Sequence, residues 1–351
     1  MLALALVGLL AALPPGASQA APQGIEQGRA TGQTSSPEQQ PTPGPPSTPG
    51  ASAETEAPAP PVAAPRPPDR DPRANSLRRG ELLTPEGITL DRADFAERAA
   101  RADFILIGES HANRCDHLIQ ASLLAGLAHR GLRPVVGLEM IPVDQRAIVD
   151  LFNQGRIEPE SLGEALAWPT LWGFDYELYE PVFQVARRFE LPIAALNVPK
   201  NVARMVLDGK VKPDEVKPRW LLPRVIILSP PAQEPELRRV FDAHRSLGHG
   251  TRREESAPRA LEEDFERFVL AQSLWDSKMA LEAMDASEKH GGPVVILAGI
   301  RHVEHGWGIA HRLHVLSPGA RLLTVLPWRG GEQPEAGAAD LFFYCPETPD
   351  D

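Results

Sequence analysis

The chain has 351 residues, of which 42% are hydrophobic and 24% are charged, and its formal net charge is −11. This length and apolar content are typical of a soluble protein with one large domain or two small ones. The negative charge argues against nucleic acid or an anionic membrane as the standing partner, because both attract basic surfaces. Two cysteines cannot form a disulfide framework, so burial of apolar surface must stabilise the fold.

The first 20 residues have the pattern of a secretory signal peptide. An apolar run covers residues 2–13, and the small residues Ser18 and Ala20 precede the expected cleavage site. The run is too short to cross a bilayer. It departs from the signal-peptide pattern in one respect, because no Lys or Arg precedes it. No cysteine lies near the cleavage site to carry a lipid anchor. We therefore expect an exported protein, soluble and either periplasmic or secreted.

Residues 21–75 are rich in proline, with fourteen prolines between Pro22 and Pro72. Such a composition cannot bury a core, and it predicts a disordered linker. The folded domain is expected to cover residues 76–351. Within it, the proline-rich stretch of residues 210–260 interrupts the pattern and predicts a helical insertion or cap.

Short apolar runs alternate with helical periods along the domain. Four runs cover residues 104–107, 135–138, 193–196 and 294–298, and helical spacing is found in residues 116–131, 143–152, 181–189 and 261–288. Two further strands are expected at residues 321–326 and 341–344. The alternation predicts an α/β fold with a parallel or mostly parallel sheet flanked by helices.

Polar residues follow each of the four runs at once. They are Glu109 and His111, Glu139, Asn197, and His302. Ligands of parallel sheets bind outside the carboxyl ends of the strands, so we expect these side chains to meet at one sheet edge. A carboxylate beside an imidazole forms an acid and base pair or half of a metal site. The alternative is structural: Glu109 only orients His111, and Glu139 only accepts backbone N–H groups.

Histidines are concentrated in residues 302–314, which hold four of the ten in the chain. His302 and His305 have a His-x-x-His spacing without the glutamate of a metalloprotease helix, which is a weak metal signature. We therefore rank a metal ion below an organic ligand. His311 and His314 are expected at the solvated surface, and Arg312 in or beyond a glycine-containing loop.

Aromatic residues form a second group around Gly173, and they are Trp168, Trp172, Phe174, Tyr176 and Tyr179. Core packing and a site for a flat ligand explain such a group equally well. Tyr179 is of interest because a tyrosine oxygen can bind ferric haem iron.

Several motifs in a fixed order indicate a family. They are Ile107-Gly-Glu-Ser-His111 with His117 and Gln120, Gly137-Leu-Glu-Met140 with Gln145, residues 168–179, Leu196-Asn-Val-Pro199, residues 268–280 and residues 299–312. Together they resemble the ChaN family of haem-binding proteins, within the erythromycin esterase and ChaN-like (Tiki) superfamily. The resemblance covers about residues 88–343.

The resemblance implies a haem-binding protein of the bacterial envelope that serves haem or iron uptake, with an outer-membrane uptake system as partner. It also implies tyrosine ligation of the iron and haems shared between two subunits of a homodimer. Of the available tyrosines, Tyr176, Tyr179 and Tyr344, we select Tyr179 as the iron ligand. The other residues expected near the haem are Tyr176, Trp168, Trp172, His302, Asn197 and Arg312, the last for a propionate.

The same superfamily includes esterases and Tiki-type proteases, so hydrolysis is the alternative function. It would use Glu109, His111, Glu139 and His302, with a histidine activating water and a glutamate orienting it or helping to hold a metal. The chain departs from the family pattern at Arg301, in place of a glycine, and at Ala310, in place of a proline. The lipoprotein cysteine of many relatives is also absent.

Overall fold

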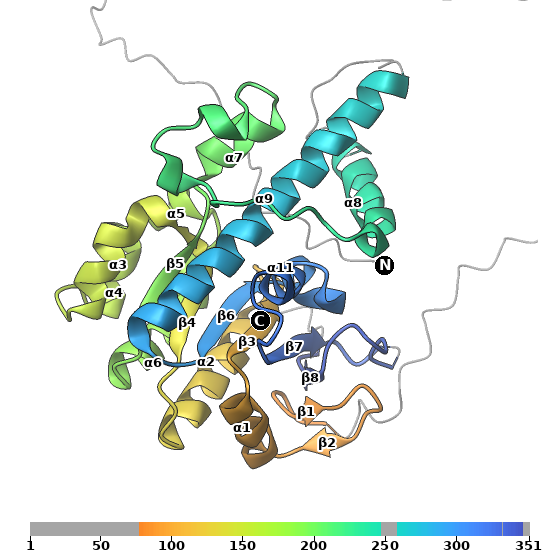
Figure 1. Cartoon of the computed structure of the whole chain (residues 1–351). Coiled ribbons are helices and arrows are strands. Elements are labelled where there is room, and N and C mark those ends of the chain that lie inside the picture. The colour runs from red at the N-terminus through yellow and green to blue at the C-terminus, as the bar shows by residue number, and fades with distance from the viewer. Residues whose placement is uncertain (1–76, 247–257, 332, 347–351) are drawn as a thin grey trace, which may run out of the picture. The chain divides into compact units, whose positions relative to one another are not determined.

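The computed structural model of the protein describes residues 77–246, 258–331 and 333–346 (Figure 1). The predicted signal peptide, residues 1–20, and the predicted linker, residues 21–75, lie outside the described residues. Residues 247–257 of the predicted insertion also lie outside them. The domain boundaries therefore stay predictions.

Eight strands form one sheet in the order β2-β1-β8-β7-β3-β6-β4-β5. Their bounds are β1 Leu82–Leu83, β2 Thr89–Leu90, β3 Phe104–Glu109, β4 Val135–Pro142, β5 Ile193–Asn197, β6 Val294–Gly299, β7 Leu322–Trp328 and β8 Leu341–Tyr344. The strands from β8 to β5 are parallel to one another, and β1 pairs in the antiparallel sense with both β2 and β8. The predicted α/β fold with a mostly parallel sheet is confirmed.

Helices from the first half of the domain pack against one face of the sheet. They are α1 Arg92–Arg101, α2 Arg114–His129, α3 Arg146–Asn153, α4 Pro159–Ala165, α5 Trp168–Leu171 and α6 Tyr176–Arg188, with the short 3-10 helix η2 Val143–Gln145 before α3. Alternate strand residues such as Ile105, Ile107 and Val136 share a buried cluster with these helices.

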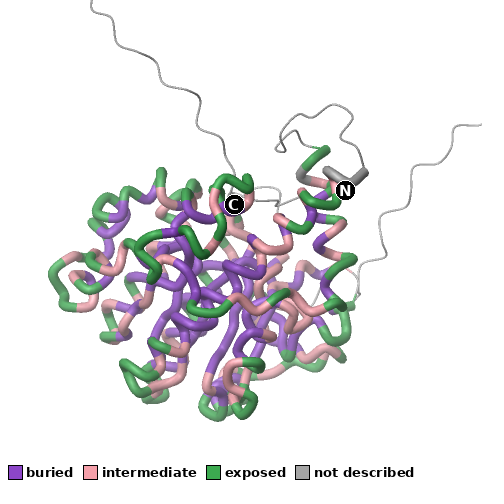
Figure 2. Tube along the Cα trace, turned by 45° about the horizontal axis from the view of Figure 1, so that its top comes forward, coloured by how far each residue is buried: buried purple, intermediate pink, exposed green. Residues whose placement is uncertain are grey.

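The opposite face of the sheet is covered by α7 Lys200–Leu207, α9 Pro258–His290 and α11 Ile309–Leu316. Leu106, Val135 and Ile296 point into this second buried cluster. The strands are therefore buried on both faces, which explains why they read as continuous apolar runs (Figure 2). In the described part of the chain, no helix combines the length and the apolar character that crossing a membrane requires.

The predicted insertion is helical only in part. Helix α8, Glu234–Ser246, packs on α9 through Phe241, Phe265 and Phe268. The preceding segment contains only three 3-10 turns, η3 Pro213–Glu215, η4 Arg219–Leu221 and η5 Pro231–Gln233, because its prolines remove the backbone donors that a helix needs.

The segment after β6, in contrast, contains three short helices. His302 lies in α10, Ile300–Val303, the 3-10 helix η6, Glu304–Gly306, follows, and Arg312 lies inside α11. Arg312 thus lies beyond the glycine-containing turn of Gly306 and Gly308, as expected, but inside a helix.

Cys115 and Cys345 form a disulfide that joins the start of α2 to the end of β8. Arg329 reinforces this junction, because its guanidinium contacts both carboxylate oxygens of Asp116 and donates to the hydroxyl of Ser110 at 3.0 Å. The Ser110 amide also donates to Asp116 at 2.9 Å. The turn that follows β3, which carries His111, is thus held from both sides.

Candidate functional site

Glu109 ends β3, and its carboxylate is the centre of a hydrogen-bond network. Only 1% of the residue is exposed. Its Oε1 accepts from the Tyr179 hydroxyl at 2.8 Å and lies 2.9 Å from His111 Nδ1, while its Oε2 accepts from the Gln120 amide at 3.0 Å. Burying a carboxylate is costly unless donors surround it, and this network meets that requirement.

His117 gives the carboxylate a second positive neighbour. Its Nδ1 lies 3.4 Å from Glu109 Oε2, and its Nε2 donates to the backbone carbonyl of His111 at 3.1 Å. Burial alone raises the pKa of Glu109, but the charge of His117 and the hydrogen bond from His111 outweigh burial and hold this pKa well below its ordinary value. Glu109 is therefore ionised at neutral pH.

His111 lies between the two carboxylates of the site. Burial lowers its pKa, but the hydrogen bond to Glu109 and the charge of Glu139 raise it above the ordinary value. Its ring packs against Trp172 and Phe174, whose ring centroids lie 4.9 and 5.3 Å from its own. Among the described residues, no hydrogen-bond partner faces its Nε2, and its side chain is 17% exposed.

Gly299, at the end of β6, separates Glu139 from Glu109. It pairs with Glu109 in the sheet register, and its amide donates to Glu139 Oε2 at 2.6 Å. A Cβ on Gly299 would lie 2.9–3.0 Å from ring atoms of His111. Glycine is needed here so that the imidazole can pack on the backbone.

His302 is held between two carboxylates. Its Nδ1 lies 2.6 Å from Asp276 Oδ1, and its Nε2 lies 3.4 Å from Glu139 Oε1. Burial alone lowers the pKa of His302, but the charges of Glu139 and Asp276 raise it to about 10. Burial likewise raises the pKa of Glu139, and the charge of His302 outweighs burial and lowers it. The pair is ionised at neutral pH.

The structure thus brings together Glu109, His111, Glu139 and His302, and Asn197 lies beside them. The Asn197 amide donates to the Glu139 carbonyl at 3.1 Å, and its side-chain oxygen accepts from Val198 at 2.8 Å. We call Glu109, His111, Tyr179, Glu139 and His302 the charged cluster, although its tyrosine is neutral.

Tyr179 belongs to this cluster, but its oxygen is not open to an outside ligand. The residue is 1% exposed, its hydroxyl donates to Glu109, and it accepts from the Trp172 indole at 2.9 Å. Burial and the charge of Glu109 raise its pKa well above the ordinary value. Iron binding at Tyr179 would therefore require Trp172 to move away.

Arg312 is not placed to bind a propionate, which corrects that expectation. It is fully buried, and its guanidinium donates to the Ile227 carbonyl at 3.2 Å, the Gly308 carbonyl at 3.1 Å and the Ser229 hydroxyl at 3.0 Å. It also lies 3.4 Å from Asp276. Its donors are thus used within the protein.

Of two other predicted aromatic residues, Trp168 lies in the core and Tyr176 packs against it half-buried. Trp168 is fully buried and its indole donates to the Phe174 carbonyl at 3.0 Å. The Tyr176 hydroxyl donates to the Pro159 carbonyl, and its ring stacks on Phe183. Neither side chain lines the cavity described next, but Trp168 packs on Tyr179 with ring centroids 5.2 Å apart.

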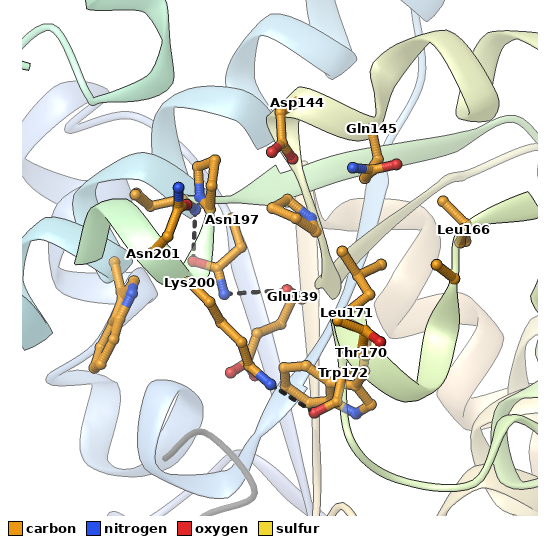
Figure 3. A pocket seen from close by; sticks show the side chains of 16 residues that line it. Glu139, Asp144, Gln145, Leu166, Thr170, Leu171, Trp172, Asn197, Lys200 and Asn201 are labelled. Atoms are coloured by element: carbon orange, nitrogen blue, oxygen red, sulfur yellow. Dashed lines mark hydrogen bonds between the residues drawn. The ribbon is translucent and has the colours of Figure 1, made fainter. Parts of the chain in front are cut away.

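A cavity of about 310 Å³ adjoins the charged cluster at the carboxyl ends of β4 and β5 (Figure 3). Glu139 belongs to both, and Trp172 lines the cavity and contacts Tyr179 and His111 of the cluster. Apolar and aromatic side chains supply much of the lining, and Lys200 brings an ammonium group; the lining includes Met140, Pro142, Leu166, Leu171, Trp172, Val198, Pro199 and Trp275. Such an arrangement is typical of sites for organic ligands.

Sequence reasoning missed Asp276 and Lys200 as site residues. Asp276 is 1% exposed and lies on the same face of α9 as the buried Phe268 and Ala280, which are eight residues before it and four residues after it. A carboxylate at a core-facing position was the available signal. Lys200 gives no comparable signal.

Within the described residues, no group of three or more metal-binding side chains has a geometry that could hold a metal ion.

Residues 95–313 match the sequence profile of a family described as haem-binding uptake, Tiki superfamily, ChaN. The chain belongs to this family. The solved structure of ChaN of Campylobacter jejuni, described as binding haem cofacially, has a TM-score of 0.57 and 21% sequence identity to this chain. The match covers 76% of this chain and 96% of that one. At this identity, the likeness shows the shared fold.

Two more distant structures are an erythromycin esterase EreC variant in its open conformation and a succinoglycan biosynthesis protein. Their TM-scores are 0.39 and 0.41, at 14% and 13% identity, with 70% and 71% of this chain covered and 76% and 72% of theirs. Likenesses this distant assign no role or ligand to this ChaN family member. No curated protein matches the chain.

Gly299→Ala tests the close approach of His111 to the backbone. We expect it to lower the free energy of unfolding by roughly 1–3 kcal/mol, because the new methyl group would overlap the imidazole. Urea unfolding measures the change. Gly126→Ala in α2 is the control, since its Cβ would meet nothing within 4 Å. Equal stabilities of the two variants would contradict the packing described.

The ion pairs of His302 predict a pH dependence. Its folded-state pKa of about 10 lies above the ordinary 6.5, so its stabilisation is complete below about pH 6.5 and is lost as pH rises towards 10. We expect the difference in unfolding free energy between wild type and His302→Gln to shrink over this range. His314→Gln, at an exposed position, is the matched control substitution measured beside it. A pH-independent difference for His302→Gln would contradict the ion pairs.

Proposed function

We propose that the protein binds haem and acts in haem or iron handling in the cell envelope. The observation that carries the proposal is the family match over residues 95–313, whose motifs meet at one charged cluster beside an aromatic cavity. Fold alone does not imply function, and it is the site beside the cavity that adds support.

The donor chemistry of the site fits a haem. Phenolate and imidazole are both protein ligands of haem iron, and the cluster contains Tyr179 and His111. Among the described residues, His111 Nε2 has no hydrogen-bond partner, while its Nδ1 is held by Glu109, as second-shell carboxylates hold metal-binding histidines. Trp172 and Trp275 offer aromatic surface in the adjoining cavity. Haem would supply an iron centre that either donor can bind.

The disulfide between Cys115 and Cys345 supports the envelope location, because disulfides persist in oxidising compartments. The predicted signal peptide points the same way. A soluble periplasmic or secreted protein, acting with an outer-membrane uptake system and as a homodimer, is the finer form of the proposal.

A hemin titration followed by absorbance tests the proposed function. We expect a saturable change of the Soret band with wild type, and its loss in Tyr179→Phe, which removes the proposed iron ligand and keeps the ring. Tyr176→Phe is the matched control, since its hydroxyl bonds to Pro159 in the core. If no specific complex forms with wild type, haem binding is wrong. If His111→Gln alone loses the complex, the ligand is His111.

Hydrolysis of an ester or peptide is a second candidate, and the Asp276–His302 contact favours it specifically. A carboxylate that orients an imidazole is the arrangement of acid and base catalysts, and here the distance is 2.6 Å. His302 Nε2 faces Glu139, which lines the cavity. A substrate in the cavity would thus lie close to a group that can exchange a proton.

Turnover of a panel of esters and peptides tests this candidate. We expect His302→Ala to lower any turnover by about a hundredfold or more, the usual contribution of a general acid or base. His314→Ala, at an exposed position, should leave it unchanged. A wild-type protein that is inert across both panels would exclude hydrolysis of these substrates.

A further inference from the structure

Trp172 closes the charged cluster on the side of the cavity. Its ring contacts His111, and its indole N–H donates to the Tyr179 hydroxyl at 2.9 Å. The residue is 2% exposed, although its neighbours Thr170 and Gly173 are exposed. The other residues of the turn are exposed or half-buried, so the Trp172 side chain is the buried group that separates the cavity from both candidate iron ligands.

The backbone around Trp172 has the features of a movable segment. The Trp168 indole donates to the Phe174 carbonyl at 3.0 Å and so holds the far end of the segment, and between them Gly173 has a φ of +94°, which glycine adopts without strain. Ala167, before the segment, has a φ of +50°. Helix α5 is only four residues long, so few backbone hydrogen bonds hold the turn.

Lys200 ties this turn to the opposite wall of the cavity. Its Nζ donates to the Trp172 carbonyl at 2.8 Å, and Figure 3 shows the bond crossing from α7 to the turn. Its ammonium lies 5.8 Å from the Trp172 ring. Within the part of the chain that the structure describes, it forms no ion pair with a carboxylate, and burial lowers its pKa. Its hydrogen bond to the turn is therefore its only polar contact among those residues.

We propose that residues 169–175 form a lid over the charged cluster and that Lys200 is its latch. When the lid opens, Trp172 leaves both Tyr179 and His111, and a ligand in the cavity can reach them. The proposal rests on the proposed function only for the identity of that ligand. It explains how a cluster enclosed by its own side chains can serve as a binding site.

Hydrogen exchange of the Trp172 indole N–H, followed by NMR in the purified protein without ligand, tests the lid. In Lys200→Met we expect this exchange to become about tenfold faster, as expected for the loss of one hydrogen bond to a charged group. Trp172→Phe assigns the signal. Lys200→Arg, which keeps a donor, should exchange at close to the wild-type rate.

Lys210→Met is the matched control, because this exposed lysine pairs with Asp208 away from the cavity. Thermal unfolding must be similar in all variants, so that faster exchange reports local opening. If Lys200→Met does not fold, Trp172→Phe replaces it. Its readout is exchange of the backbone amides of residues 170–175, which should become faster. Exchange unchanged from wild type in the variant used would overturn the proposal.

The rate of hemin association separates this inference from the proposed function. If wild type binds hemin, we expect Lys200→Met to bind it several-fold faster, because opening precedes binding. An unchanged association rate would overturn the lid as the gate for haem. If wild type binds no hemin, the haem proposal fails, and the exchange experiment still decides whether the lid exists.

Discussion

The buried carboxylate of Glu109 is the constraint on which the site depends. Placed at the end of a strand with 1% exposure, it must collect donors from the surrounding chain. Tyr179 supplies one from α6, Gln120 one from α2, and His111 one from the turn after β3. A single charge thus determines how three separate segments pack at this sheet edge.

The rest of the cluster continues the same balance of charge. Glu139, at the end of β4, receives the Gly299 amide and the charge of His302, and Asp276 holds the far side of that imidazole. Arg312 in turn neutralises Asp276 from a fully buried position. The charges alternate in sign, so the arrangement is stable although most of it is out of water.

The proposed haem binding and the alternative, hydrolysis, would both use this one arrangement. A haem ligand needs an oxygen or nitrogen that can face the iron, and a hydrolase needs an imidazole with a controlled proton. The cluster would offer the first at Tyr179, once Trp172 moves away, or at His111, where Nε2 has no partner among the described residues, and the second at His302. In the proposed lid, access from the cavity to Tyr179 and His111 passes the Trp172 turn, whereas Glu139, which faces His302, lines the cavity directly.

The sequence by itself determined the sheet and the convergence of its polar residues. Apolar runs report strands buried on both faces, and parallel strands bring their carboxyl ends to one edge, so Glu109, Glu139, Asn197 and His302 were found from local pattern. Only the tertiary structure decided the partners. Tyr179 bonds to a residue 70 positions away and Asp276 to one 26 positions away. Periodicity reports which face is buried, whereas a hydrogen-bond partner depends on how helices cross the sheet.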